Sequence, residues 1–198
     1  MPTPRDAVLV SVLAHAGLRP EEAFALRWGD VGRTLTIWRV FPAGELRGRT
    51  KTGRVRSVEI VGPLAEDLGS IRPRVRAAED LVFPSPRGRP IDFHNWRYRI
   101  WKPATQDAGV AATPYDLRHA CISRLVHDGR SVVYVAAMAG NSPRMVLERY
   151  SHLFAEAELG TGKPMVDAIR AARAGSGLRS DCDVRVLRAS AEPVGPAS

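Results

Sequence analysis

The chain has 198 residues, of which 44% are hydrophobic and 25% charged, and its 29 Lys and Arg outnumber 21 Asp and Glu to give a formal charge of +8. This length suits one ordinary domain with enough apolar residues for a core, which excludes wholesale disorder. The basic excess indicates a polyanionic partner, most often nucleic acid.

Cysteine usage and the N-terminus predict a protein of the reducing cytoplasm. Cys121 and Cys182 lie far apart, which excludes a disulfide framework and a zinc motif. The apolar stretch 7–13 after Arg5 resembles a short secretory signal, but Asp6 cancels the leading charge and the apolar spacing is that of a helix. No apolar run approaches the length of a membrane span.

Two helices are predicted at the start of the chain. Thr3 and Pro4 suit the N-cap and first position of a helix whose apolar stripe ends at Gly17. A second, shorter helix is predicted over residues 20–28.

Alternating apolar and polar residues then predict a small antiparallel sheet. Leu35, Ile37 and Phe41 alternate with polar residues in the first strand, and Val58 and Ile60 do so in the second. The segment between them has turn chemistry at Gly53.

Helices dominate the remainder, bounded by Gly, Pro, Asp or Asn. They are predicted over residues 63–71, 93–106, 115–127, 131–138 and 143–152, with one more near 164–174. Residues 175–198 are rich in Gly, Ala, Ser and Pro and predict a disordered tail with at most a short strand at 184–187. We therefore expect an α+β, mainly α, domain over residues 1–174.

Basic residues gather in two clusters, one near the predicted hairpin and one around the helix that carries Trp96, Tyr98 and Trp101. A single cluster is usually a solvated face, but two together with a pI near 10.3 favour a surface that binds phosphate. The helical spacing of Trp96 and Ile100 favours core packing over stacking on bases. The residues expected to grip DNA are Arg47, Arg49, Arg54, Arg56, Arg97, Arg99 and Lys102.

Four strings carry more information than these clusters. They are AGLRPEEAFALRWGDV with Arg19, TKTGRVRSV with Lys51, PYDLRHA with Arg118, and Gly-Asn-Ser at Asn141 followed by Tyr150. Together and in this order they resemble the catalytic domain of tyrosine recombinases, the phage-integrase family. The resemblance implies a tyrosine-recombinase-type fold and two catalytic arginines, Arg19 and Arg118.

The residue types suit cleavage of a phosphodiester without a metal or another cofactor. Arginine remains charged and can bond two phosphate oxygens at once. The resemblance implies that Tyr150 attacks phosphorus to form a 3′-phosphotyrosyl link and that Lys51 protonates the leaving 5′ oxygen. Because the ester retains the bond energy, rejoining requires neither ATP nor Mg²⁺. Glu22 either orients an arginine through an ion pair or complements the dipole of its helix.

Two positions depart from the family pattern. Tyr115 stands where the family usually has histidine, and Asn141 stands where it has histidine or tryptophan. Both side chains can donate a hydrogen bond to phosphate, but neither shuttles protons near neutral pH as imidazole does. Two activators of the phenol of Tyr150 therefore remain open. One is the pair of arginines, and the other is His119, which in the family usually lies outside the catalytic set.

The resemblance also bears on domain organisation and partners. Family members normally carry a DNA-clamping domain before the catalytic domain, whereas only about one short helix precedes Arg19, so we expect that domain to be absent. The helix near residues 164–174 is a candidate for exchange between protomers of a synaptic tetramer on double-stranded DNA, or it packs on its own core.

The sequence thus predicts site-specific DNA recombination or integration, as in a mobile element. Two alternatives remain: a non-catalytic DNA-binding remnant of an integrase, and a DNA relaxase similar to type IB topoisomerases. A metal-dependent nuclease is not favoured, because the acidic residues form no evident metal cluster.

Overall fold

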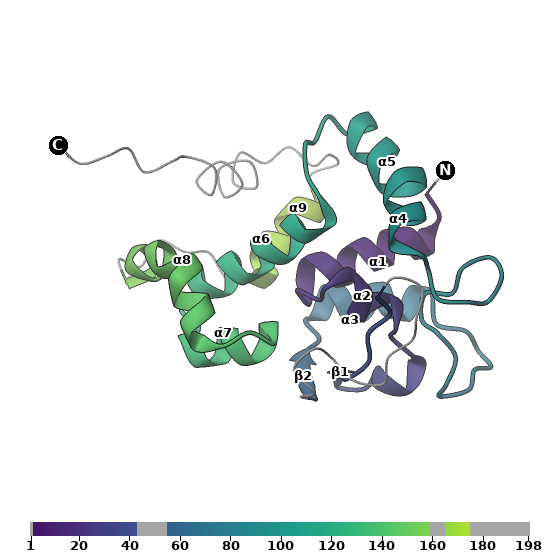
Figure 1. The fold of residues 1–198 in the computed structure, drawn as a ribbon, viewed down its shortest axis with the longest axis horizontal. Helices are drawn as coiled ribbons and strands as arrows, with labels where there is room; N and C mark the ends of the chain where they lie inside the picture. Colours follow the sequence, from purple (N-terminus) through teal and green to yellow (C-terminus); the bar gives the residue numbers. More distant parts are fainter. Residues whose placement is uncertain (1, 43–54, 159–164, 175–198) are drawn as a thin grey trace.

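The computed structural model describes residues 2–42, 55–158 and 165–174, and its first helix begins where the capping residues predicted (Figure 1). Helix α1 (Pro4–His15) has Thr3 at its N-cap. The Thr3 hydroxyl accepts from the Asp6 amide at 3.2 Å, and the Asp6 carboxylate accepts from the Thr3 amide at 2.8 Å. This reciprocal pair satisfies two amides that the first turn leaves unpaired. The helix ends just before Gly17, which has a positive φ of 59°.

Helix α2 (Pro20–Phe24) is shorter than predicted. Its helical pattern is broken because the chain turns to pair with residues 78–82. The Trp28 amide donates to the Asp80 carbonyl, and the Val82 amide donates to the Leu26 carbonyl, each at 2.9 Å. A short 3-10 turn, η1 (Trp28–Asp30), follows.

The predicted antiparallel sheet is confirmed, with two strands, β1 (Thr34–Ile37) and β2 (Arg56–Glu59). Leu35 lies opposite Val58, and both are fully buried. Ile37 lies opposite Arg56, so that residue shares the inward face. Phe41 lies outside β1, because its amide donates instead to the Glu21 carbonyl at 2.8 Å.

The predicted helices of the remainder are also present. Residues 93–107 form one run in which a wider π-helical turn ends two residues before Pro103, whose ring nitrogen has no hydrogen for the Arg99 carbonyl. Helix α8 continues past the predicted end at residue 152. The elements are α3 (Gly62–Ser70), α4 (Phe93–Trp96), η2 (Arg97–Trp101), α5 (Lys102–Asp107), α6 (Pro114–His127), α7 (Val132–Ala139), α8 (Pro143–Glu158) and α9 (Met165–Ala174).

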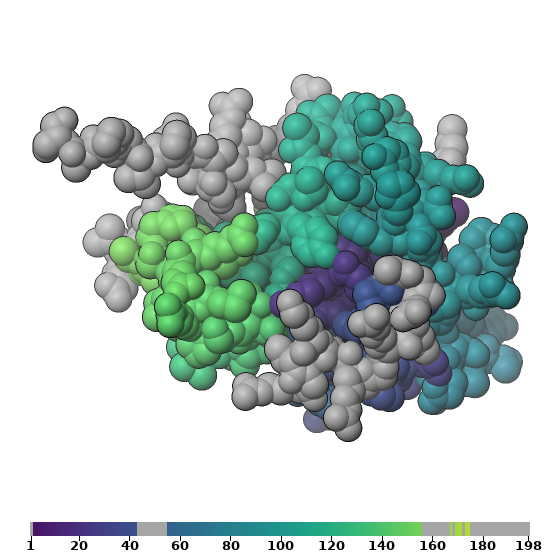
Figure 2. Space-filling view, in the orientation of Figure 1, coloured from purple at the N-terminus to yellow at the C-terminus, as the bar shows by residue number. Residues whose placement is uncertain are grey.

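Helix α1 lies at the centre, packed against α6 on one side and α3 on another, while α6 also contacts α7 and α8. The N-terminal elements are therefore seen between the atoms of α7 and α8 and those of α4 and α5 (Figure 2). Helix α9 packs against α3 of its own chain, and the Arg173 guanidinium pairs with the Asp67 carboxylate at 2.5 Å. The predicted tail and its strand lie outside the described residues. In the described part of the chain, no helix has the length and apolar character to cross a membrane.

Candidate functional site

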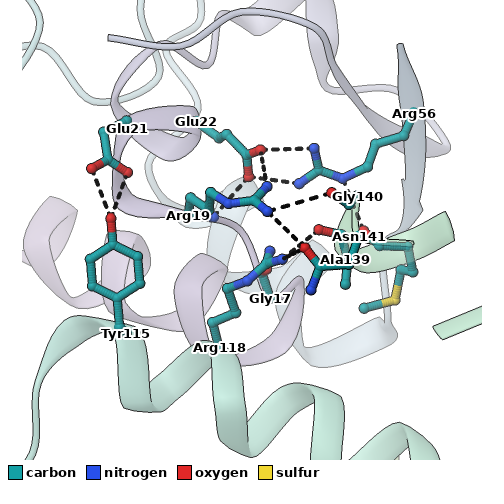
Figure 3. A network of polar contacts seen from close by, with 11 residues as sticks. Gly17, Arg19, Glu21, Glu22, Arg56, Tyr115, Arg118, Ala139, Gly140 and Asn141 are labelled. Carbon is teal, nitrogen blue, oxygen red and sulfur yellow. Dashed lines mark hydrogen bonds and ion pairs between the residues drawn. The ribbon is translucent and has the colours of Figure 1, made fainter. Parts of the chain in front are cut away.

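Three distant segments meet at one cluster of polar side chains (Figure 3). Arg19 is the N-cap of α2, Arg118 lies near the start of α6, and Asn141 lies in the turn between α7 and α8. The Asn141 side-chain oxygen accepts from Arg19 Nη2 at 2.8 Å and lies 3.5 Å from Arg118 Nη2. The structure thus brings together three residues that the sequence predicted for the site.

Arg118 is held by backbone carbonyls in the interior. Its Nη1 donates to the Gly17 carbonyl and its Nη2 to the Ala139 carbonyl, both at 2.5 Å, and the residue is 5% exposed. Burial, followed by the nearby charge of Arg19, lowers the pKa of Arg118 to about 10. The guanidinium is therefore a fixed cation at neutral pH.

Glu22 is a buried carboxylate between two guanidiniums, with 1% of its side chain exposed. It accepts from Arg19 Nη1 at 3.0 Å, and from Arg56 Nη1 and Nη2 at 2.8 and 2.6 Å. Burial raises the pKa of Glu22, but the hydrogen bonds and charges of Arg56 and Arg19 outweigh it and hold that pKa below its ordinary value. Glu22 also accepts from the Arg19 amide at 2.8 Å, so the ion pair and the helix cap occur together.

Arg56 was expected to grip DNA from the predicted hairpin, but its side chain points into the protein. Only 9% of its side chain is exposed, and besides Glu22 its Nε donates to the Met138 carbonyl at 2.9 Å. The sequence contains a signal for this orientation: Arg56 lies two residues before the buried Val58, so strand alternation places both on one face.

Tyr115 lies to one side of this cluster, paired with Glu21 (Figure 3). Its hydroxyl donates to the Glu21 carboxylate, whose oxygens lie 2.8 and 3.1 Å away. Burial and the contact with Glu21 raise the pKa of Tyr115. The hydroxyl proton expected to serve a phosphate is thus engaged by a carboxylate.

Tyr150 and His119 form a direct pair, with 2.5 Å between the phenolic oxygen and Nδ1. Tyr150 is only 6% exposed, and burial raises its pKa, opposed by the charges of Arg149 and Arg118. Burial, and then the charge of Arg149, lower the pKa of His119, which favours the neutral imidazole. A neutral imidazole can accept a proton from the phenol.

The second basic cluster lies on the protein surface around η2 and α5. Arg97, Arg99 and Lys102 are exposed, and the Lys102 ammonium lies 5.9 Å from the ring centre of Tyr98. Trp96 is 4% exposed and Ile100 is partly buried against the core, as their helical spacing predicted, and Trp101, at 7% exposed, also lies in the core. Among the described residues, no three His, Cys, Asp or Glu side chains gather as metal ligands would. The remaining predicted residues, Arg47, Arg49, Lys51 and Arg54, lie outside the described residues.

Comparison with known protein sequences points to one family. The model of the phage integrase family matches residues 3–157. The chain is 28% identical over 150 residues to tyrosine recombinase XerC of Corynebacterium efficiens, covering 75% of this chain and 46% of that protein. It is also 28% identical over 157 residues to tyrosine recombinase XerD of Proteus mirabilis, covering 77% and 49%. The chain therefore spans about half the length of these relatives.

Solved structures share the fold. The crystal structure of XerA recombinase matches with a TM-score of 0.62 at 23% identity, over 79% of this chain and 56% of that one. The Tn1549 transposon integrase in complex with a circular intermediate DNA matches with a TM-score of 0.61 at 20% identity, over 78% and 57%. The family model covers most of the chain and the predicted catalytic strings lie largely within it, so the chain belongs to the phage integrase family and has the fold of a tyrosine recombinase catalytic domain.

Proposed function

We propose that this chain performs site-specific recombination or integration of double-stranded DNA by metal-independent cleavage and rejoining. The observation that carries the proposal is the convergence of Arg19, Arg118 and Asn141 from three distant segments. Relatives named tyrosine recombinases and a neighbouring integrase in complex with DNA support the same reaction class.

The arginines would bind the non-bridging oxygens of the phosphate that is cleaved. Arg19 has 36% of its side chain exposed and can turn donors outward, whereas Arg118 is fixed by two carbonyls beneath it. Preorganised cations stabilise the charge of the pentacovalent transition state without having to reorganise during the reaction. Asn141 holds the two guanidiniums close to each other despite their repulsion.

Tyr150 would supply the nucleophilic oxygen, and His119 would accept its proton. The O–P bond forms as the bond from phosphorus to the 5′ oxygen breaks, which leaves a 3′-phosphotyrosyl ester. The phenolic proton passes to His119 Nδ1, its 2.5 Å partner. Of the two activators open from the sequence, this contact favours His119, with the arginines lowering the barrier electrostatically.

Lys51 would protonate the leaving 5′ oxygen, a role that rests on its resemblance to the family's catalytic lysine. Exposed Arg97, Arg99 and Lys102 would hold the flanking DNA backbone. Arg47, Arg49 and Arg54 are proposed for the same task from the sequence. We further propose that protomers assemble on DNA as a synaptic tetramer, with α9 leaving its own core for a neighbour, and that the reaction takes place in the cytoplasm.

A pool of nicked duplexes with a randomised central sequence tests the reaction. A nick near the cleaved bond lets the short 5′-hydroxyl strand diffuse away, which traps the covalent adduct. We expect the wild-type chain to form an adduct stable to denaturant, Tyr150→Phe to form none, and Tyr134→Phe to match the wild type. Tyr134 is a suitable control because its hydroxyl bonds Glu59 at 3.2 Å, outside the site.

Three outcomes would contradict the proposal. Salt-dependent binding without an adduct would indicate a non-catalytic DNA-binding protein. Relaxation of supercoiled plasmid without sequence preference would indicate a relaxase. An adduct that persists in Tyr150→Phe would show that another residue is the nucleophile.

A further inference from the structure

We infer that Arg56 is a positioning residue of the reaction: it holds Glu22 and the end of α7 so that Arg19 and Asn141 keep their geometry. The inference rests on the proposed function and assigns Arg56 a role other than gripping DNA.

All three nitrogens of the Arg56 guanidinium are engaged inside the protein. Nη1 and Nη2 donate to the two oxygens of Glu22 at 2.8 and 2.6 Å, and Nε donates to the Met138 carbonyl at 2.9 Å. With these partners and only 9% of its side chain exposed, Arg56 is bound on its guanidinium end to Glu22 and Met138. Arg19, by contrast, gives one guanidinium nitrogen to Glu22 and has 36% of its side chain exposed. Arg56 is therefore the more buried of the two guanidiniums that bind this carboxylate.

The turn at the end of α7 is shaped around the same guanidinium. Gly140 has a φ of +63°, and a Cβ at this position would lie 3.0 Å from Arg56 Nη1 and 3.1 Å from its Cζ. The Gly140 carbonyl lies 3.4 Å from Arg19 Nη2, and Asn141 follows directly. A left-handed glycine lets the turn approach Arg56 and offer its oxygens to Arg19.

Arg56 therefore joins three elements at one point: β2 through its backbone, α2 through Glu22, and the α7 end through Met138. Its planar fork is needed for this, because two nitrogens match the carboxylate while the third reaches a carbonyl in another direction. Lysine would keep the charge beside Glu22 but would lack the fork. The Arg56→Lys variant therefore tests the geometry of the hydrogen bonds while the charge is kept.

The first test is kinetic, on a DNA sequence recovered from the wild-type adduct. We expect Arg56→Lys to lower the rate of adduct formation at saturating DNA by about 10- to 100-fold, the range typical of losing a residue that orients a group in the site. The Kd for DNA should change by less than about threefold. The matched control is Arg39→Lys, because Arg39 pairs with Asp30 at 2.9 Å, is equally buried at 9% and lies outside the site. We expect Arg39→Lys to keep the wild-type rate.

The second test asks whether the effect passes through the charge on phosphate. A methylphosphonate at the cleaved bond removes the negative charge that Arg19 would stabilise. The penalty of Arg56→Lys should then shrink several-fold relative to the penalty on the ordinary phosphate. An equal penalty on both substrates, or a loss of rate matched by loss of DNA affinity, would overturn the inference.

The third test does not depend on turnover. In protein labelled with ¹⁵N-arginine and ¹⁵N-asparagine, Arg56→Lys should shift the Arg19 Nε–H and Asn141 side-chain resonances, whereas Arg39→Lys should leave both in place. Unchanged resonances would overturn the inference even if the wild type forms no adduct. A wild type without adduct contradicts the proposed function instead, so the two failures are distinguishable.

Discussion

Two buried arginine–carboxylate sites in this molecule differ in their charge balance. At the first, Arg39 Nη2 pairs with Asp30 Oδ1 at 2.9 Å, and Trp38 Nε1 donates to the same carboxylate oxygen at 3.1 Å. The Arg39 guanidinium also lies 4.0 Å from the Trp38 ring centre. One cation faces one anion, and the pair is neutral. Such a pair fits a structural role.

At the second site, Glu22 faces both Arg19 and Arg56, with Arg118 beyond Asn141. Two guanidiniums thus share one carboxylate with a third close by, so positive charge exceeds negative charge in this partly buried cluster. Unpaired buried charge is costly, so its presence indicates a site that an anion completes. Charge balance, more than burial, therefore separates an anion site from a structural pair in this molecule.

The largest effect is expected from removing the buried cation. Arg118→Ala should slow adduct formation by about a thousandfold, the cost of losing a preorganised donor to the transition state. Arg39→Ala should lower thermal stability but leave the rate of the folded fraction unchanged. Comparable rates for the two variants would break the distinction between the sites.

Removing the shared carboxylate should lower the stability of the folded protein. Glu22→Gln leaves two guanidiniums without a counter-charge and should lower the free energy of unfolding at pH 7 by about 3 kcal/mol. Because the folded pKa of Glu22 lies below its ordinary value of 4.5, the contribution is complete above that pH and is lost as the pH falls through the folded value. The difference from wild type should therefore narrow in acid, measured by urea unfolding.

Sulfate provides the matched comparison for that variant. Added sulfate should restore part of the stability of Glu22→Gln, since an anion replaces the missing carboxylate, and should not do so for Asp30→Asn. Equal responses would show that the two sites have the same affinity for anions.

A smaller effect, with a characteristic pH dependence, is expected at His119. His119→Asn should slow adduct formation by about 100-fold, at the lower end of the range for a general base. The base must be neutral, so the wild-type rate should fall as the pH drops through the His119 pKa, which lies below 6.5, and the variant should lose this limb. The control His127→Asn, on the same helix, should keep both the wild-type rate and its fall at low pH.

The smallest effect is expected at Tyr115. Because its hydroxyl already donates to Glu21, Tyr115→Phe should change the rate of adduct formation by less than about threefold, as for loss of one partly exposed hydrogen bond. A loss of more than tenfold would show that the hydroxyl turns from Glu21 to phosphate when DNA binds, as the sequence prediction held.

Local signals predicted most of the elements and missed where distant segments interrupt them. The start of α1 was predictable because the Thr3 cap and Pro4 act within one turn. The early end of α2 was not, because it depends on amides near Trp28 pairing with residues 78–82. In the same way, the pairing of Tyr115 with Glu21 joins residues far apart along the chain and had no local signal.

Periodicity, capping and residue chemistry act over a few residues, so the class of fold, the order of the four family-like strings and the basic excess could be derived from the sequence. Which charges meet depends instead on the tertiary structure. It turned Arg56 from the expected DNA surface toward Glu22, placed His119 against Tyr150, and separated the neutral Arg39 pair from the cationic cluster at Arg19. Such contacts between distant segments arise only when packing brings those segments together.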